Sequence, residues 1–246
     1  MNAVLFAGPS IFGIEPAIVG EVDLEPPAAC GDLLRAARNG AEVIGLVDGV
    51  FESCPSVWHK EILAILGKGI RVFGAASMGA LRAAECAPFG MVGVGSIFAD
   101  YSAGRRVADA DVAVLHAPAE LGFRPLTEAL VNVEATVGRL ICLDRIDLSE
   151  KEKLIIAARK LHFKQRNWDR IFVDAALAQD RIASLARDVV DFRVDQKLRD
   201  AMLLIDRMKN GGEEKARPAG FVNRTVFQAA LERTIATEDR TPAGPA

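Results

Sequence analysis

The first half of the sequence alternates short apolar runs with stretches whose apolar residues recur every three or four positions. Short apolar runs bounded by glycine and proline are typical of buried strands, whereas the wider spacing is typical of amphipathic helices. Strands that alternate with helices in this way form a parallel sheet covered by helices on both faces. The sequence therefore predicts an α/β fold, a Rossmann-like doubly wound parallel sheet.

The individual elements follow from the same pattern. The expected strands are Ala3–Ala7, Val22–Leu24, Val43–Val47, Ile70–Gly74 and Val112–Leu115. The expected helices between them are Leu33–Ala37, Val57–Leu66 with Ser56 as N-cap, and Met78–Cys86. Right-handed crossovers place the carboxyl ends of all these strands at one edge of the sheet.

The pattern changes to purely helical in the second half of the chain. Its clearest stretch is a set of apolar residues spaced by three or four, Leu126, Leu130, Val133, Val137 and Leu140. Such spacing is typical of one face of a helix. We expect residues 1–122 to form the α/β core, residues 123–237 a helical subdomain packed against it, and residues 238–246 a loose tail.

Composition bears on three questions: whether the protein binds nucleic acid, whether its cysteines form a zinc site or disulfides, and where in the cell it is located. Hydrophobic residues make up 50% of the chain, the net charge is −3, and no basic block is present, which argues against a nucleic-acid partner. The four cysteines form no CxxC pair, so neither a zinc site nor a disulfide framework is expected. The chain has no apolar stretch of ~18 residues and no N-terminal segment typical of a signal peptide, which predicts no membrane span and a cytoplasmic location.

Polar residues stand where the predicted strands end. Ser10 follows the first strand, Asp48 the strand at 43–47, Ser77 the strand at 70–74, and His116 the run at 112–115. Ligands of open α/β sheets bind outside the carboxyl ends of the strands. We therefore expect these four residues to gather at one binding edge.

The sharpest motif is Gly-Ala-Ala-Ser-Met-Gly-Ala-Leu at residues 74–81, between a strand and a helix. Small residues around Ser77 permit the tight turn of a nucleophile elbow, although Ala75 replaces the first glycine of that consensus. The backbone N–H groups of Met78 and Gly79 at the helix N-terminus are then candidates to bind an oxyanion. The alternative is that Ser77 only caps the helix.

A second group of polar residues comes from two helices. His59, in the first turn of its helix, is a candidate general base, and the alternative is that it is an ordinary surface histidine. Lys60 is a candidate ligand for an anionic group. Arg82 and Glu85 are three residues apart and either pair with each other or, for Arg82, bind a carboxylate. Asp48, at the end of its strand, orients a histidine, holds a metal or only starts a turn.

Metal and cofactor signals are weak. His116 and Glu120 have a spacing suited to two ligands on a helix, but Pro118 lies between them. The glycines between Gly90 and Gly95 lack the spacing of a dinucleotide-binding loop and follow a helix. No metal and no cofactor are predicted.

These motifs resemble the TfuA-like family. The matching segments are Gly8–Ser10, Pro26–Ala28 with Gly31–Asp32, Asp48–Phe51, Val57–Leu63, Gly74–Glu85, Phe89–Met91, Gly93–Gly95 and Asp111–Val114. They span about residues 3–135, and the segments 57–63 and 74–85 are the most specific. The helical half is less diagnostic.

The resemblance implies a role in sulfur transfer. TfuA-like proteins accompany YcaO enzymes, which use ATP to activate a backbone amide of a peptide, and thioamidation follows when sulfur replaces the amide oxygen, as in RiPP biosynthesis. The resemblance implies that the TfuA-like partner supplies the sulfur by hydrolysing the C-terminal thiocarboxylate of a ubiquitin-like sulfur carrier protein. The partners implied are a YcaO enzyme, the carrier and the precursor peptide.

This chemistry assigns expected roles to the residues. Lys60 or Arg82 would neutralise the thiocarboxylate, Ser77 would attack with His59 as its base and Asp48 as its orienting group, and the helix N–H groups would hold the oxyanion. Ser10, Glu85 and His116 are expected to contribute to substrate binding. Two alternatives stay open: His59 activates a water instead, or the protein is a non-catalytic adaptor that stimulates a YcaO enzyme.

Overall fold

A five-stranded parallel sheet forms the centre of the molecule. The computed structural model describes residues 2–52, 54–210 and 226–238. The strands are β1 (Ala3–Phe6), β2 (Asp23–Glu25), β3 (Val43–Leu46), β4 (Arg71–Ala75) and β5 (Val92–Val94). They lie in the order β2-β1-β3-β4-β5, and every pair is parallel. The predicted doubly wound α/β fold is confirmed.

The other regular elements of the described chain are helices and 3-10 turns. The 3-10 turns are η1 (Pro9–Ile11), η2 (Ala87–Phe89), η3 (Asp109–Asp111), η4 (Ala119–Leu121) and η5 (Phe163–Gln165). The α-helices are α1 (Pro16–Val19), α2 (Asp32–Arg38), α3 (His59–Leu66), α4 (Met78–Cys86), α5 (Gly95–Ser102), α6 (Leu130–Cys142), α7 (Leu148–Lys160), α8 (Trp168–Asp174), α9 (Gln179–Phe192), α10 (Gln196–Asn210) and α11 (Val226–Glu238).

Two local predictions were wrong. Residues 112–115 form no strand, and the fifth strand is β5 at Val92–Val94. The chain from Val112 follows the turn η3, and Leu115 is held by the Thr127 hydroxyl and by the N–H of Leu126. Helix α3 begins at His59 rather than at residue 57, and Trp58 rather than Ser56 occupies the N-cap position.

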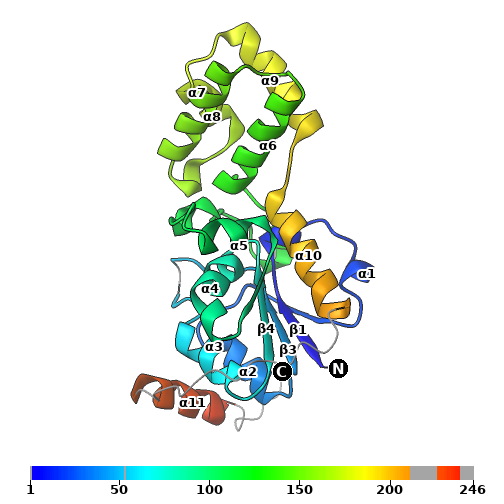
Figure 1. Cartoon of the computed structure of the whole chain (residues 1–246), viewed down its shortest axis with the longest axis vertical. Coiled ribbons are helices and arrows are strands. Elements are labelled where there is room, and N and C mark those ends of the chain that lie inside the picture. The colour runs from blue at the N-terminus through cyan, green and yellow to red at the C-terminus, as the bar shows by residue number, and fades with distance from the viewer. Residues whose placement is uncertain (1, 53, 211–225, 239–246) are drawn as a thin grey trace.

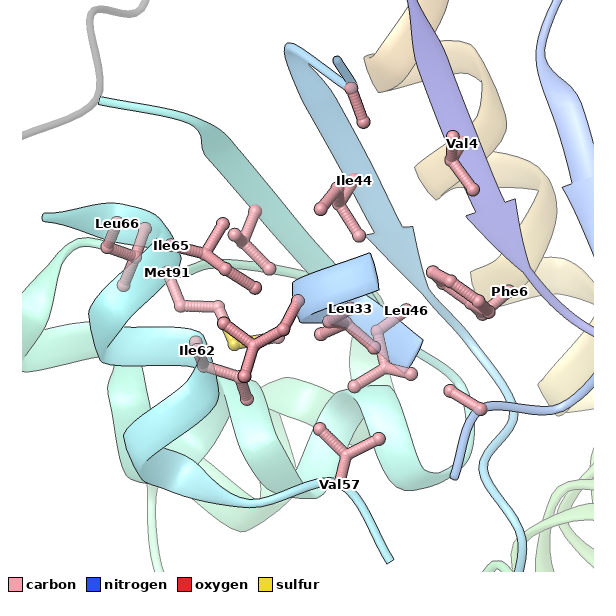
Figure 2. Packing of buried hydrophobic residues seen from close by; sticks show 14 of the residues in the cluster. Val4, Phe6, Leu33, Ile44, Leu46, Val57, Ile62, Ile65, Leu66 and Met91 are labelled. Atoms are coloured by element: carbon pink, nitrogen blue, oxygen red, sulfur yellow. The ribbon is translucent and has the colours of Figure 1, made fainter. Parts of the chain in front are cut away.

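The strands of the sheet send alternate side chains into two hydrophobic cores, as the period of a strand requires. On one face, Val4, Phe6, Ile44 and Leu46 pack against α2 and α3. Figure 2 shows these side chains in one cluster with Leu33, Val57, Ile62, Ile65, Leu66 and Met91. Helix α4 also covers this face, and the partly buried Leu231 of α11 packs against the same core.

The opposite face of the sheet is covered by a helix from the second half of the chain. Leu5, Val43 and Phe73 on that face pack against α10. Figure 1 shows α10 on the side of the sheet away from α2, α3 and α4. Gly45 allows the close approach, because a side chain there would overlap the sulfur of Met208. Part of the predicted helical half is thus a layer of the α/β core.

Helices α6 to α9 share a hydrophobic core of their own. Its fully buried members include Leu140, Leu154, Ile171 and Leu185, and these helices stand together at one end of the molecule (Figure 1). The chain thus leaves the sheet, builds this helical group and returns with α10. The predicted division at residue 122 stays a prediction, and residues 239–246 of the predicted tail lie outside the described residues.

Candidate functional site

The strand order places a site at the carboxyl edge of β1 and β3. From β1 the sheet continues to β2 on one side and to β3 on the other, so the loops after β1 and β3 leave in different directions. Such a switch point is where open α/β sheets bind ligands. A cavity of about 640 Å³ opens at this edge, and Asp48, Ser77 and His116 are among its lining residues.

Asp48 joins the loops that follow β1 and β3. It is 2% exposed. Its Oδ2 accepts hydrogen bonds from the backbone N–H groups of Gly8 and Ser10, both at 2.9 Å, and its Oδ1 accepts from the Ser10 hydroxyl at 2.7 Å. Ser10 and Asp48 are therefore brought together as predicted, and the carboxylate shapes the loop beside the cavity.

Ser77 occupies the N-cap position of α4 and lines the cavity. Its side chain makes no capping hydrogen bond, so the hydroxyl does not serve the helix in the way the capping alternative requires. The preceding residue, Ala76, has a φ of 64°, in the left-handed region that costs a residue with a Cβ about 1 kcal/mol or more. The turn that presents Ser77 is thus held against a local backbone preference.

The N–H groups beside Ser77 differ in what they contact. The N–H of Gly79 donates to the carbonyl of Val47 at 3.1 Å, so it is already used inside the fold. Gly79 is also needed for packing, since a Cβ there would overlap the carbonyl oxygen of Leu46. Within residues 2–52, 54–210 and 226–238, no hydrogen bond uses the N–H of Met78 or of Gly49. Both residues line the cavity, and they lie against each other.

The second predicted group lies away from the cavity lining. The His59 Nε2 is 2.7 Å from the Glu85 carboxylate, and both side chains are about half exposed. Arg82 donates to the same carboxylate at 2.7 Å and to the carbonyl of Val57 at 2.8 Å. Lys60 is next to His59 in the first turn of α3. His59, Arg82 and Glu85 thus join α3 to α4 at the surface, and neither they nor Lys60 line the cavity.

His116 is the histidine among the residues that line the cavity. Its Nδ1 is 2.8 Å from the carbonyl oxygen of Ala117, and its ring packs edge-on against Phe123. A carbonyl only accepts, so Nδ1 carries the proton in the neutral ring. The Nε2 of neutral His116 then has a free lone pair, which is what a general base requires.

A buried lysine in the cavity was not predicted from the sequence. Lys197, in the first turn of α10, is 3% exposed and lines the cavity. Its Nζ donates to the carbonyl of Val112 at 2.8 Å and lies 3.8 Å from the Asp48 Oδ1. A signal existed, because residues 197, 201, 204, 205 and 208 are spaced as one helix face and all but Lys197 are apolar.

A model of the TfuA-like protein family matches residues 48–167. The chain belongs to the TfuA-like family. No curated protein matches the sequence. The family associates the chain with YcaO enzymes and with thioamidation, and the matched span contains Asp48, Ser77 and His116.

Two residues at the cavity edge of this TfuA-like chain lie outside the matched span. Ser10 comes before it and Lys197 after it, yet both lie beside Asp48 in space. Most other lining side chains are apolar, among them Val50, Phe51, Leu81, Val114, Phe123 and Phe163. The cavity therefore suits an apolar or extended group that ends in a charged or polar atom.

Two negative findings complete the description of the site region. No helix among the described residues is long and apolar enough to cross a membrane. The same residues contain no group of three or more histidine, cysteine, aspartate or glutamate side chains arranged to hold a metal ion, and His116 and Glu120 do not lie on a shared helix.

Proposed function

We propose that this TfuA-like protein is an enzyme that supplies sulfur for YcaO-dependent thioamidation by hydrolysing a thiocarboxylated ubiquitin-like carrier. The observation that carries the proposal is the cavity at the switch point. Ser77, whose hydroxyl makes no capping hydrogen bond, lines it together with Met78 and Gly49, whose backbone N–H groups take part in no hydrogen bond among the described residues. Nucleophilic acyl transfer needs these parts: an uncommitted nucleophile and donors for an oxyanion.

In the proposed reaction the Ser77 oxygen attacks the thiocarboxylate carbon. The carbon–sulfur bond breaks, the serine proton passes by way of the base to sulfur, and HS⁻ leaves with an acyl-serine remaining. Water then hydrolyses the ester to the carrier carboxylate and returns the hydroxyl to Ser77, with one proton released. The N–H groups of Met78 and Gly49 would bind the oxyanion in each step.

The proposed base is His116, since it is the histidine of the cavity lining and its Nε2 is free when the ring is neutral. His59, predicted as the base from the sequence, is engaged with Glu85 outside the lining, and its role stays a prediction. Asp48, with three donors on its carboxylate, would hold the loop after β1 in place.

The partners of the proposed reaction are the carrier and, through the YcaO enzyme, the precursor peptide. An extended carrier C-terminus would lie along the apolar lining formed by Phe51, Leu81, Phe123 and Phe163. We expect the reaction to run in the cytoplasm. The sulfide released would then be consumed by the YcaO enzyme as it replaces the amide oxygen.

The test is sulfide release from a thiocarboxylated carrier in the absence of any YcaO enzyme. Ser77→Ala is expected to reduce the rate by about a hundredfold or more, with unchanged folding. His116→Ala and His59→Ala form a matched pair: we expect a large loss for the first and near-normal rate for the second. A normal rate with Ser77→Ala together with a large loss in one of the two histidine variants would favour a mechanism in which that variant's native histidine activates a water.

Exposed apolar side chains on three helices keep the adaptor as a second candidate function. Leu148, Val173 and Val190 on α7, α8 and α9 are 73%, 67% and 79% exposed. Exposed apolar side chains of this kind suit contact with another protein. Thioamidation assays with sulfide supplied freely distinguish the two functions, because only an adaptor is still required when sulfide is abundant.

A further inference from the structure

Lys197 is a buried cation on the face of α10 that packs against the sheet. It is 3% exposed and has apolar neighbours at Ala201 and Leu204 along the same face of the helix. Removing an ammonium group from water is costly unless other charges or a ligand compensate, and buried ion pairs add little net stability. The fold therefore gains little from this lysine, which points to a use at the cavity.

The ammonium group of Lys197 has hydrogen-bonding capacity left over. A lysine ammonium carries three N–H donors. For Lys197, the hydrogen bonds of the described residues account for one, to the carbonyl oxygen of Val112 at 2.8 Å. The Asp48 Oδ1 is 3.8 Å from Nζ, too far for a hydrogen bond. Asp48 already accepts from Gly8 and twice from Ser10, so it does not depend on the lysine.

Burial and the surrounding carboxylates act in opposite directions on the pKa of Lys197, and burial, the larger influence, lowers it below its usual value. The charges of Asp48, Asp195 and Glu128 raise this pKa. Asp195 and Glu128 have other partners. Asp195 accepts a hydrogen bond from the side chain of Asn132 at 3.0 Å, and Glu128 forms an ion pair with Arg193 at 2.8 Å. Lys197 thus lies in a field of negative charge with no carboxylate in direct hydrogen-bonding contact.

Lys164 also lines the cavity, but its situation differs. It is 49% exposed and forms an ion pair with Glu52 at 2.6 Å. Its charge is screened by water and by its partner. Lys60 and Arg82, the cations predicted to neutralise the substrate, do not line the cavity. Lys197 is therefore the lining cation with donors to offer to a ligand.

We propose that Lys197 binds the anionic acyl end of the substrate, a carboxylate or thiocarboxylate, inside the cavity that contains Ser77. The identity of the acyl group rests on the proposed function, while the anion site follows from the contacts of Lys197. Asp48 acts as a positioning group that orients the loop after β1 beside this site.

The experiment uses benzoate and benzamide as probes, because they share a ring that fits the apolar lining and differ in charge. Binding to the full chain is measured by isothermal titration calorimetry. The wild-type protein is expected to prefer benzoate by about tenfold or more, as hydrogen bonds to a charged group imply. Lys197→Met should abolish the preference, Lys197→Arg should retain most of it, and Lys164→Met is the matched control that should keep it.

Two results would overturn the proposal: no preference for benzoate in the wild-type chain, or an unchanged preference in Lys197→Met. Thermal unfolding checks that the variants fold, which we expect because Asp48 keeps three donors. Should Lys197→Met not fold, the ¹⁵N resonance of the Lys197 Nζ in the wild-type chain decides, since benzoate and not benzamide should shift it. If the wild-type chain prefers benzoate but releases no sulfide from the thiocarboxylated carrier, the proposed hydrolase function is contradicted and the proposed anion site is still supported.

Discussion

Glu61 is a buried carboxylate whose ionisation should set part of the pH dependence of stability. It is 2% exposed and accepts hydrogen bonds from the N–H groups of Trp58 at 2.8 Å and Gly31 at 3.0 Å, which tie α3 to the start of α2. Burial raises its pKa from 4.5 to about 7, although these N–H groups act in the opposite direction.

The direction of the effect follows from linkage. Below the unfolded pKa of 4.5 the Glu61 carboxyl is protonated in both states, so burial of its charge costs nothing. Between this pKa and about 7 the unfolded chain loses its proton first, and the free energy of unfolding falls as pH rises. A pKa raised from 4.5 to about 7 costs the native state about 3 kcal/mol at higher pH.

The assay is urea unfolding of the wild-type chain and of Glu61→Gln from about pH 4 to about pH 8. The glutamine does not ionise, so the variant should gain about 3 kcal/mol relative to the wild type across this range. Glu152→Gln, at an exposed position of α7, controls for the loss of one negative charge. A difference between Glu61→Gln and wild type that does not change with pH would refute the reasoning.

Four further substitutions test the packing and the elbow by chemical denaturation. Gly79→Ala should lower the free energy of unfolding by about 1–3 kcal/mol or more, because its methyl group would overlap the Leu46 carbonyl oxygen. Gly138→Ala in α6 has open space around the new methyl group, so it should raise the free energy of unfolding by about 0.5–1 kcal/mol. Ala76→Gly should stabilise the chain by about 1 kcal/mol because φ is 64° there, and an unchanged stability would argue against strain at the elbow. Leu154→Ala should cost about 2–5 kcal/mol, since its side chain is fully buried in the core of α6 to α9, and a cost below 1 kcal/mol would contradict that packing.

Most of the sheet could be predicted from the sequence because its central strands β1, β3 and β4 are buried on both faces, which requires apolar residues along nearly their whole length. That signal is local, and β1, β3 and β4 lie where it predicts them. It failed for residues 112–115, because an apolar segment lining a cavity has the composition of a strand. It missed β5, which is short and has glycine in its centre.

The predicted gathering of polar residues at the strand ends depends on topology as well as on residue type. Asp48, Ser77 and His116 line one cavity, and Ser10 is bonded to Asp48. His59 begins the helix after β3, yet its side chain meets Glu85 on the surface of α4. The rotation of a helix about its axis, which decides whether a side chain faces a cavity, depends on packing and not on the sequence position alone.

The sequence by itself therefore determined the type of fold, the edge of the sheet where the candidate site lies, and the resemblance to a family. Only the tertiary structure decided that α10 returns across the sheet and brings Lys197 to 3.8 Å from Asp48, 149 positions earlier in the chain. Local patterns carry the periods of strands and helices, whereas a contact between distant segments depends on how every intervening element packs. The spacing along α10 marks Lys197 as part of a buried helix face, but only the tertiary contact shows that this face brings the lysine into the cavity.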